Sequence, residues 1–447
     1  MSSQIVFLTL YLGLIAGHQP VELQVGSDVK SVRILVDGRE SAVMTAAPWR
    51  AIVDLGPAFE PHELVAVAYD RDGGEIGRTS QMINLPRPLA ELTLTLQVDD
   101  KGLPVSVGLR WEHVFAAKPS RATIRIDGRK IGVDDQFHAR LPTLDAAHPH
   151  VVDAELRFED GVVARHELVI AGGHAADSIS TELTPLVFTS KTPWKQESLV
   201  GCFSVNGAPV LARGVETPDA LVLVVREPDA NEVQAVLDPG HSDSRSWRET
   251  QEVRHRLPLD PRTTMSYTWP ISKPVEAAGH VPSKIFQSSV AVSSQDAGML
   301  RFLTFDYGES SDQRTGVDPN TPRRFADAVA VAGLNASNGA HRRAVVLVLS
   351  RSADQSTNEP ASVRHYLEAI GVPLFVWSLT GPRPDLAASW GEVDDISEPK
   401  QFRAAVERLR ASLASQHVVW IASDRLSALH AEANPRCGVT PLAHMGR

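Results

Sequence analysis

Short alternating segments make up the first 173 residues of the chain. Apolar and polar residues alternate there with a period of two, and no helical period is present. Asp-Gly pairs separate several of the segments, and this dipeptide between alternating stretches is a strong signal for a tight hairpin. The first part of the chain is therefore predicted to form antiparallel β-structure.

An internal repeat divides this region into two copies. The segment ILVDGRE at 34–40 returns as IRIDGRK at 124–130. In each copy a Pro-His pair, 61–62 or 149–150, then opens a strand that leads to a second Asp-Gly. Several short strands in each copy predict an immunoglobulin-like antiparallel β-sandwich.

Residues 5–17, IVFLTLYLGLIAG, have two interpretations. They have the length and the small terminal residues of a signal-peptide core, but the preceding MSSQ lacks the Lys or Arg of a standard signal peptide. They are also too short for a membrane-spanning helix. The alternative is a first β-strand that enters the sandwich directly, and both interpretations remain open.

The pattern changes after residue 181, where apolar strands alternate with amphipathic helices. The predicted strands include LVLVV (221–225), MLRFLTFDYG (299–308), AVVLVL (344–349), VPLFVWSL (372–379) and HVVWIAS (417–423). The predicted helices are 319–337, 361–371 and 402–416. Alternation of apolar strands with helices predicts a doubly wound, mostly parallel α/β sheet.

These patterns divide the chain into five segments. They are β-sandwich 1 at 1–88, β-sandwich 2 at 89–173, a β-hairpin linker region at 181–218, an α/β domain at 219–425 and a C-terminal tail at 426–447. The predicted fold class is therefore multidomain, with two antiparallel sandwiches followed by an α/β layer.

The order of pieces in the second half resembles the von Willebrand factor A-type domain, in particular its divergent bacterial, acidobacterial-like group. The pieces are a hairpin with the first strand at 203–225, the fourth strand and its loop at 342–356, the fifth strand at 368–381, and the last helix and strand at 402–423. The resemblance spans roughly 185–425 and is weak between 232 and 298.

The resemblance implies a divalent-ion site, with an Asp-x-Ser-x-Ser loop after the first strand and an aspartate after the fourth. Oxygen ligands of this kind suit magnesium or calcium. The matching positions here are Arg226, Glu227, Pro228, Asp229 and Ala230 in the loop, and Arg351 after the fourth strand. Arg226, Pro228, Ala230 and Arg351 offer no side-chain oxygen, and guanidinium groups repel a divalent cation. We therefore expect a degenerate site, with no metal and no cofactor.

Four interpretations of the two arginines are open. In the first, Arg226 and Arg351 are solvated loop residues. In the second, they bind a partner's carboxylate in place of the ion. In the third, they form internal salt bridges with Glu227, Asp229 or Asp354. In the fourth, Asp229, Glu232 and Asp354 retain a metal. The candidate partner-binding residues are Arg226, Glu227, Asp229, Arg351 and Asp354.

Charge and cysteine content limit the partners and the compartment. The formal net charge is −10, without a block of basic residues, which argues against nucleic acid or an anionic membrane as the main partner. The two cysteines, Cys202 and Cys437, have no metal-ligand spacing. They either pair in an oxidising compartment or remain two buried thiols.

Catalytic motifs are weak in this sequence. PHELV (61–65) and RHELV (165–169) lack the second histidine of a zinc-protease helix. The segment HSDS at 241–244 places triad residue types in one polar loop, whereas catalytic triads assemble from distant segments. We therefore expect no enzymatic activity.

The leading hypothesis is a non-catalytic protein–protein interaction module, extracytoplasmic by analogy with the family that it resembles. A second hypothesis is a carbohydrate-binding or cell-envelope scaffold protein that uses the sandwiches. Its candidate aromatic residues are Trp49, Tyr69, Trp111 and Phe115. A third is a hydrolase that uses the histidine-containing polar loop.

Overall fold

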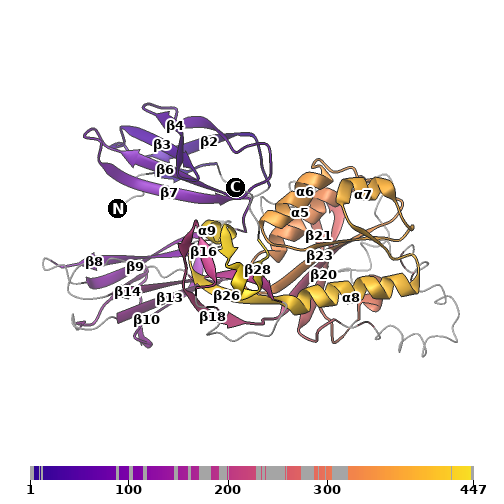
Figure 1. Ribbon diagram of the computed structural model, residues 1–447. Helices are drawn as coiled ribbons and strands as arrows, with labels where there is room; N and C mark the ends of the chain where they lie inside the picture. The colour runs from indigo at the N-terminus through magenta and orange to yellow at the C-terminus, as the bar shows by residue number, and fades with distance from the viewer. Residues whose placement is uncertain are drawn as a thin grey trace. The chain divides into compact units, whose positions relative to one another are not determined.

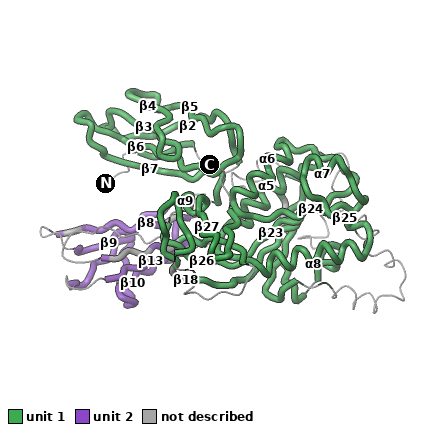
Figure 2. Tube along the Cα trace, viewed as in Figure 1, with its two compact units in different colours: residues 1–86, 183–447 green, residues 87–182 purple. Residues whose placement is uncertain are grey.

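The computed structural model (Figure 1) divides into two compact units. Residues 1–86 and 183–447 form the first unit, and residues 87–182 form the second (Figure 2). The boundary falls inside the proline-rich segment 84–88 that separates the two copies of the repeat. The described residues are 5–9, 11, 14–86, 90–99, 104–113, 118–144, 150–159, 163–170, 183–190, 199, 201–227, 233, 237, 257, 259–272, 286–289, 291–296, 298–304, 321–423 and 425–443.

The first copy of the repeat folds as two antiparallel sheets around one core. The sheet orders are β1-β2-β5 and β4-β3-β6-β7. The strands are β1 (Ile5–Phe7), β2 (His18–Val25), β3 (Ser31–Val36), β4 (Arg39–Met44), β5 (Arg50–Asp54), β6 (His62–Tyr69) and β7 (Glu75–Ile83). Ile34 and Leu64 are fully buried between the sheets, and Ile5 and Phe7 join them from β1. Residues 5–7 of the ambiguous N-terminal segment therefore form a strand of the sandwich.

The second copy has the same arrangement of sheets, β8-β9-β12 and β11-β10-β13-β14. The strands are β8 (Ala90–Val98), β9 (Pro104–His113), β10 (Pro119–Ile126), β11 (Arg129–Ile131), β12 (His138–Arg140), β13 (His150–Phe158) and β14 (Val163–Ile170). Ile124 and Val152 occupy its core, as Ile34 and Leu64 do in the first copy. The prediction of two antiparallel β-sandwich modules is confirmed.

The repeated Asp-Gly turn is held by the repeated histidine. Asp37 and Asp127 adopt positive φ angles of 51° and 46°, each in a two-residue hairpin loop. The Asp37 carboxylate lies 2.7 Å from Nδ1 of His62, and Asp127 lies 2.7 Å from Nδ1 of His150. The same carboxylates accept the backbone N–H of the residue after each histidine. The Pro-His signal therefore marks a turn clamp, and the strand predicted to follow each Pro-His pair is confirmed, as β6 and β13.

The second half contains a seven-stranded sheet with a mainly parallel centre. Its order is β21-β20-β19-β23-β24-β25, with β22 pairing to β20. The strands are β19 (Ala220–Val225), β20 (Thr263–Ser272), β21 (Phe286–Ser288), β22 (Val292–Ser293), β23 (Arg342–Leu349), β24 (Leu374–Ser378) and β25 (Val393–Asp395). Five neighbouring strands pair in parallel, in the order β20, β19, β23, β24 and β25. The two remaining strands, β21 and β22, run antiparallel to β20. All eight residues of β23 are buried, as a strand covered on both faces requires.

Helices cover both faces of this sheet (Figure 1). They are α4 (Met299–Thr304), α5 (Phe325–Ala336), α6 (Pro360–Ala369), α7 (Pro384–Trp390) and α8 (Pro399–Ser415). Helices α5 and α6 share a core with Leu347 on one face of β23. Helices α4 and α8 share another core with Val346 on the opposite face. Phe402 and Leu409 anchor α8 with the spacing that its sequence predicts.

Two sequence predictions about this sheet are wrong. MLRFLT forms helix α4 rather than a strand, because Met299, Phe302 and Leu303 fall at helical spacing and are all buried. The last predicted strand, β26 (Gln416–Ala422), does not extend the parallel sheet. It pairs antiparallel with two strands that precede the α/β layer in the sequence, so local apolar content identified the strand but not its neighbours.

A separate antiparallel sheet, β18-β26-β15-β28, joins the chain before and after the α/β layer. Its strands are β15 (Leu183–Ser190), β18 (Ala212–Glu216), β26 and β28 (Val439–Pro441), and a small sheet contains β16 (Phe203–Val205), β17 (Ala208–Pro209) and β27 (Ala431–Ala433). Helix α9 (Arg425–Leu429) and a 3-10 turn, η5 (Pro435–Cys437), complete the segment interpreted from the sequence as a tail. A disulfide between Cys202 and Cys437 connects the two ends of this region. The open choice between paired and free cysteines is thereby resolved.

Candidate functional site

The predicted site lies at the carboxyl edge of the parallel sheet. The strand order reverses direction between β19 and β23, and ligands in doubly wound sheets bind beyond the strand ends at such a point. Arg226 directly follows β19, and Arg351 comes two residues after β23. The structure therefore places both positions at neighbouring strand ends, although Arg226 is buried and Arg351 is exposed.

Arg226 is built into the core rather than presented to solvent. It has no exposed surface, and its guanidinium lies 4.4 Å from the ring centre of Tyr267 and 5.0 Å from that of Trp269. Tyr267 also stacks on Phe302 of α4, with ring centres 4.2 Å apart. A desolvated cation over aromatic faces is a stabilising arrangement. The positive charge thus completes an aromatic stack at the place where the resemblance implies the first metal ligand.

Glu227 is committed to an internal ion pair. Its Oε2 accepts a hydrogen bond of 2.7 Å from Nε of Arg323, and both side chains are mostly buried. Arg323 lies just before α5, so this pair ties the loop after β19 to the entrance of that helix. One carboxylate oxygen is thus held by a cation of the same chain, while the buried Oε1 has no hydrogen-bond partner among the described residues.

Asp354 holds the loop after β23 against the start of α5. Its carboxylate accepts hydrogen bonds from the backbone N–H groups of Phe325 and Ala326, at 2.9 and 3.2 Å. It also accepts from the backbone N–H of Ser356 at 3.0 Å. A negative charge at a helix N-terminus satisfies donors that the helix itself leaves unpaired. Asp354 therefore acts on the structure of the loop.

A second carboxylate fixes the same loop from the opposite direction. Asp327, on the first turn of α5, is buried and accepts from the backbone N–H groups of Thr357 and Asn358. It also pairs with Arg324 at 2.7 Å. Residues 351–355 are nevertheless exposed. The result is a surface loop, residues 351–359, whose backbone is anchored by two carboxylates.

The remaining predicted metal positions cannot be placed. Pro228, Asp229, Ala230 and Glu232 lie outside the described residues, as does the polar loop at 241–244. Within the described part of the chain, no group of three or more His, Cys, Asp or Glu side chains could hold a metal ion. The acids at this edge that are described, Glu227, Asp327 and Asp354, each have a partner in the protein.

The aromatic residues proposed for sugar binding belong to the sandwich cores in two cases. Trp49 packs against the core of the first sandwich, and Trp111 packs against that of the second, with its ring centre 4.6 Å from that of Phe137. Tyr69 is half-buried beneath the guanidinium of Arg33. Phe115 lies outside the described residues. These three described rings therefore do not form an open aromatic platform.

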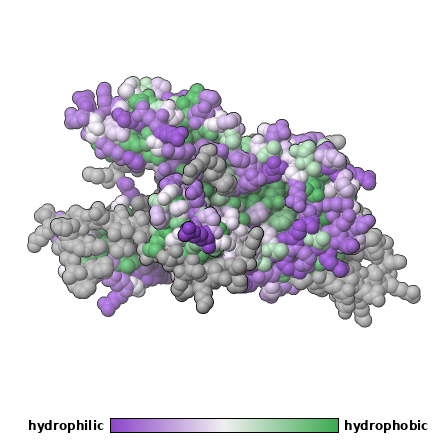
Figure 3. Space-filling view, in the orientation of Figure 1, coloured by the Kyte–Doolittle hydropathy of each residue, from purple (hydrophilic) through white to green (hydrophobic). Residues whose placement is uncertain are grey.

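The surface is mixed in polarity. On the described part of the face in Figure 3, hydrophilic residues are spread over the molecule with hydrophobic patches between them. Among the described helices, none is long and apolar enough to cross a membrane.

Two features of this edge were missed by sequence reasoning. Strand β20, TTMSYTWPIS, lies where we expected no strand, and it supplies both rings under Arg226. Alternation of Met265, Tyr267 and Trp269 with Thr and Ser was the available signal. The clamp between Asp327 and the loop after β23 had no local signal, because its partners are 30 residues apart.

Comparison with known proteins gives only distant likenesses. No protein-family model matches the chain, and no curated protein matches its sequence. Fibronectin(III)-like modules of Clostridium thermocellum CbhA are 17% identical, covering 38% of this chain and 95% of theirs, with a TM-score of 0.16. The central fibronectin-III array of RIM-binding protein is 10% identical, covering 46% and 84%, with a TM-score of 0.25. The Bacteroides ovatus glucan-utilisation protein SGBP-B is 12% identical, covering 48% and 64%, with a TM-score of 0.15. Scores this low assign no function.

Proposed function

We propose that this chain is a non-catalytic protein-binding module of the extracytoplasmic space, in which two β-sandwiches accompany a metal-independent α/β layer of the von Willebrand A type. The strand pairing supports this assignment, since β19, β23 and β24, which contain the segments that resemble the first, fourth and fifth strands of that family, are parallel neighbours in one sheet. The disulfide supports an oxidising compartment.

The observation that carries the binding role is the loop 351–359. It is exposed at the switch point of the sheet, yet Asp354 and Asp327 fix its backbone to α5. A surface that is ordered before binding loses less conformational entropy when a partner arrives. Arg351 is exposed on this loop and carries a positive charge, so the partner surface is expected to carry a carboxylate.

Metal independence follows from the chemistry of Arg226. Its guanidinium is permanently charged and fully buried beside the position of the first implied ligand. Titration calorimetry with magnesium, calcium and manganese is expected to show no binding. Micromolar binding that disappears in Asp354→Ala would overturn the metal-independent assignment.

The protein-binding role is tested by cross-linking the full chain to proteins of its native host and mapping the cross-linked peptides. Cross-links to residues 351–359 that weaken at least tenfold in Arg351→Glu support the proposal. Arg403→Glu, an exposed position on α8, is the matched charge control and is expected to leave them unchanged. Equal loss in both variants, or cross-links confined to the sandwiches, would contradict it.

A further inference from the structure

A buried arginine whose guanidinium forms no ion pair with any described residue lies at the opposite edge of the same sheet. Arg343 is the second residue of β23 and is only 7% exposed. Within the described residues its guanidinium makes no ion pair, and its Nε has no hydrogen-bond partner. The Gln416 side chain bonds only the backbone of Arg343, through its N–H at 2.8 Å and its carbonyl at 3.0 Å. The backbone is therefore clamped while the charged group is left unmatched.

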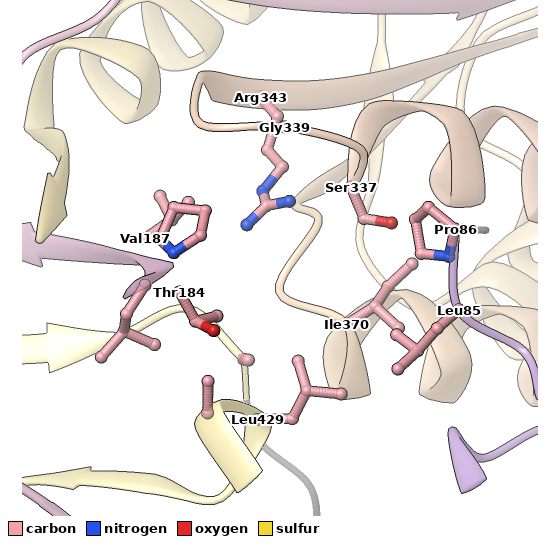
Figure 4. Close-up of a pocket in the computed structure, with 13 residues that line it drawn as sticks. Leu85, Pro86, Thr184, Val187, Ser337, Gly339, Arg343, Ile370 and Leu429 are labelled. Carbon is pink, nitrogen blue, oxygen red and sulfur yellow. The ribbon is translucent and has the colours of Figure 1, made fainter. Parts of the chain in front are cut away.

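The guanidinium points into a cavity of about 80 Å³ (Figure 4). This space is several times what one water molecule needs. Leu85, Val187, Ile370 and Leu429 supply apolar walls, and the hydroxyl groups of Thr184 and Ser337 also line it. Both hydroxyls already donate to backbone carbonyls, of Ser423 and Leu334. Arg343 is therefore the main free donor in a mostly apolar chamber.

The walls of the cavity are fixed by contacts outside it. The carbonyl of Asn84, next to Leu85, accepts a hydrogen bond of 3.0 Å from the Tyr366 hydroxyl on α6. The Asn84 side chain in turn donates to the carbonyls of Ile15 and Glu60. A preformed chamber with one placed polar group is typical of a small-molecule site.

We propose that this cavity binds a small aliphatic carboxylate, with the carboxylate paired to the Arg343 guanidinium and the alkyl group packed against the apolar walls. A planar guanidinium matches a carboxylate in bidentate geometry and neutralises a single charge. Phosphate fits less well, because its second charge and remaining oxygens would face apolar side chains. The site lies at the amino end of the strands and does not depend on the proposed protein-binding function.

His341 provides an independent measure of whether the positive charge of Arg343 is neutralised by a ligand. Burial lowers the pKa of His341, and the positive charge of Arg343 lowers it further. A carboxylate bound to Arg343 cancels that second effect, so ligand binding is expected to raise the pKa of His341. The resonance of this ring therefore reports on the site in solution.

The test is a thermal-shift and NMR titration of the full chain with acetate, propionate and butyrate. A second arm uses a short peptide that ends in a free valine carboxylate, and the same peptide with an amidated end. Sodium chloride and phosphate serve as anion controls. The proposal predicts that the unfolding temperature rises with the carboxylates, and most with the longest alkyl chain that fits.

Three variants decide the outcome. Arg343→Met is expected to weaken binding at least tenfold, and Arg343→Lys to weaken it less. Leu429→Trp fills the chamber without changing its charge and is expected to abolish binding, while Arg403→Met is a surface control that leaves it unchanged. A response to the free-ended peptide alone still supports a carboxylate site and identifies a protein as its source. No response to any carboxylate, or an equal response in Arg343→Met, overturns the proposal.

Discussion

At the carboxyl edge of the parallel sheet, Arg226 stacks on two aromatic rings, and Arg323 and Arg324 pair with carboxylates. At the amino edge, Arg342 and Arg343 are consecutive but point to opposite faces of β23. Arg342 pairs with Asp260 and donates to the carbonyl of Pro218, whereas Arg343 has a cavity in front of it. The buried cations at the carboxyl edge and Arg342 at the amino edge are thus matched by groups of the protein, whereas the Arg343 guanidinium faces a cavity.

The sharpest test of this contrast is the neighbouring pair of arginines. Arg342→Met removes the ion pair with Asp260 and is expected to lower the free energy of unfolding by about 2–4 kcal/mol, since Asp260 is one-third exposed. Arg343→Met removes an unmatched buried charge and is expected to leave stability unchanged or raised. Urea denaturation measures both. Equal destabilisation by the two changes would mean that Arg343 is a structural residue like its neighbour.

Arg226→Met tests whether the carboxyl edge uses its arginine for stability. Loss of the desolvated cation–π contacts with Tyr267 and Trp269 is expected to cost about 2 kcal/mol. Arg226→Lys is expected to recover only part, because an ammonium does not stack as a planar guanidinium does. Denaturation followed by tryptophan fluorescence provides the measurement. Unchanged stability in the methionine variant would remove the structural role assigned to this residue.

Asp354→Ala tests the anchoring of the exposed loop. It leaves the N–H groups of Phe325 and Ala326 without their acceptor and is expected to cost about 1 kcal/mol. Hydrogen exchange is expected to accelerate in residues 351–359 and in the first turn of α5. Asp385→Ala, whose carboxylate pairs with Arg383 at the surface, is the control for loss of an acidic group. Unchanged exchange in the loop would show that Asp327 alone suffices to anchor it.

Two histidines distinguish the amino-edge arginines by pH. Burial lowers the pKa of both His341 and His417, with additional lowering from Arg343 and Arg342 respectively. Because the unfolded chain then takes up protons first, stability is expected to fall as the pH drops below about 6.5. In NMR titrations, Arg343→Met is expected to raise the pKa of His341 and leave that of His417 unchanged. A shift of both, or of neither, would contradict the separation of the two arginines.

The sequence predicts those parts of the fold whose signals are local. The Asp-Gly hairpins, the apolar strands β19 and β23 and the amphipathic face of α8 can all be read from residue spacing. The pairing of β26 depends on segments about 200 residues away and could not be inferred from its composition.

The candidate site was predictable in place but not in detail. Chain order located Arg226 and Arg351 at neighbouring strand ends, yet the burial of Arg226 depends on β20, which was not among the predicted strands. No local sequence pattern indicates that Arg343 is buried, since an arginine beside another arginine at the start of a strand is usually solvated. Only the surrounding elements show that, among the described residues, Arg342 has an ion-pair partner and Arg343 has none.

The disulfide has a mechanical consequence. It joins residues 235 positions apart, so a pulling force along the chain passes from Cys202 directly to Cys437. The α/β layer, with Arg226, Arg343 and Arg351, lies inside the bypassed loop and carries no tension, whereas the cavity walls at Leu85, Thr184 and Val187 lie outside it. Reduction of the bond would release on the order of 800 Å of contour length, at about 3.3–3.6 Å per residue. In a protein held between two surfaces, the bond would keep the α/β layer folded while a pulling force acts on the rest of the chain.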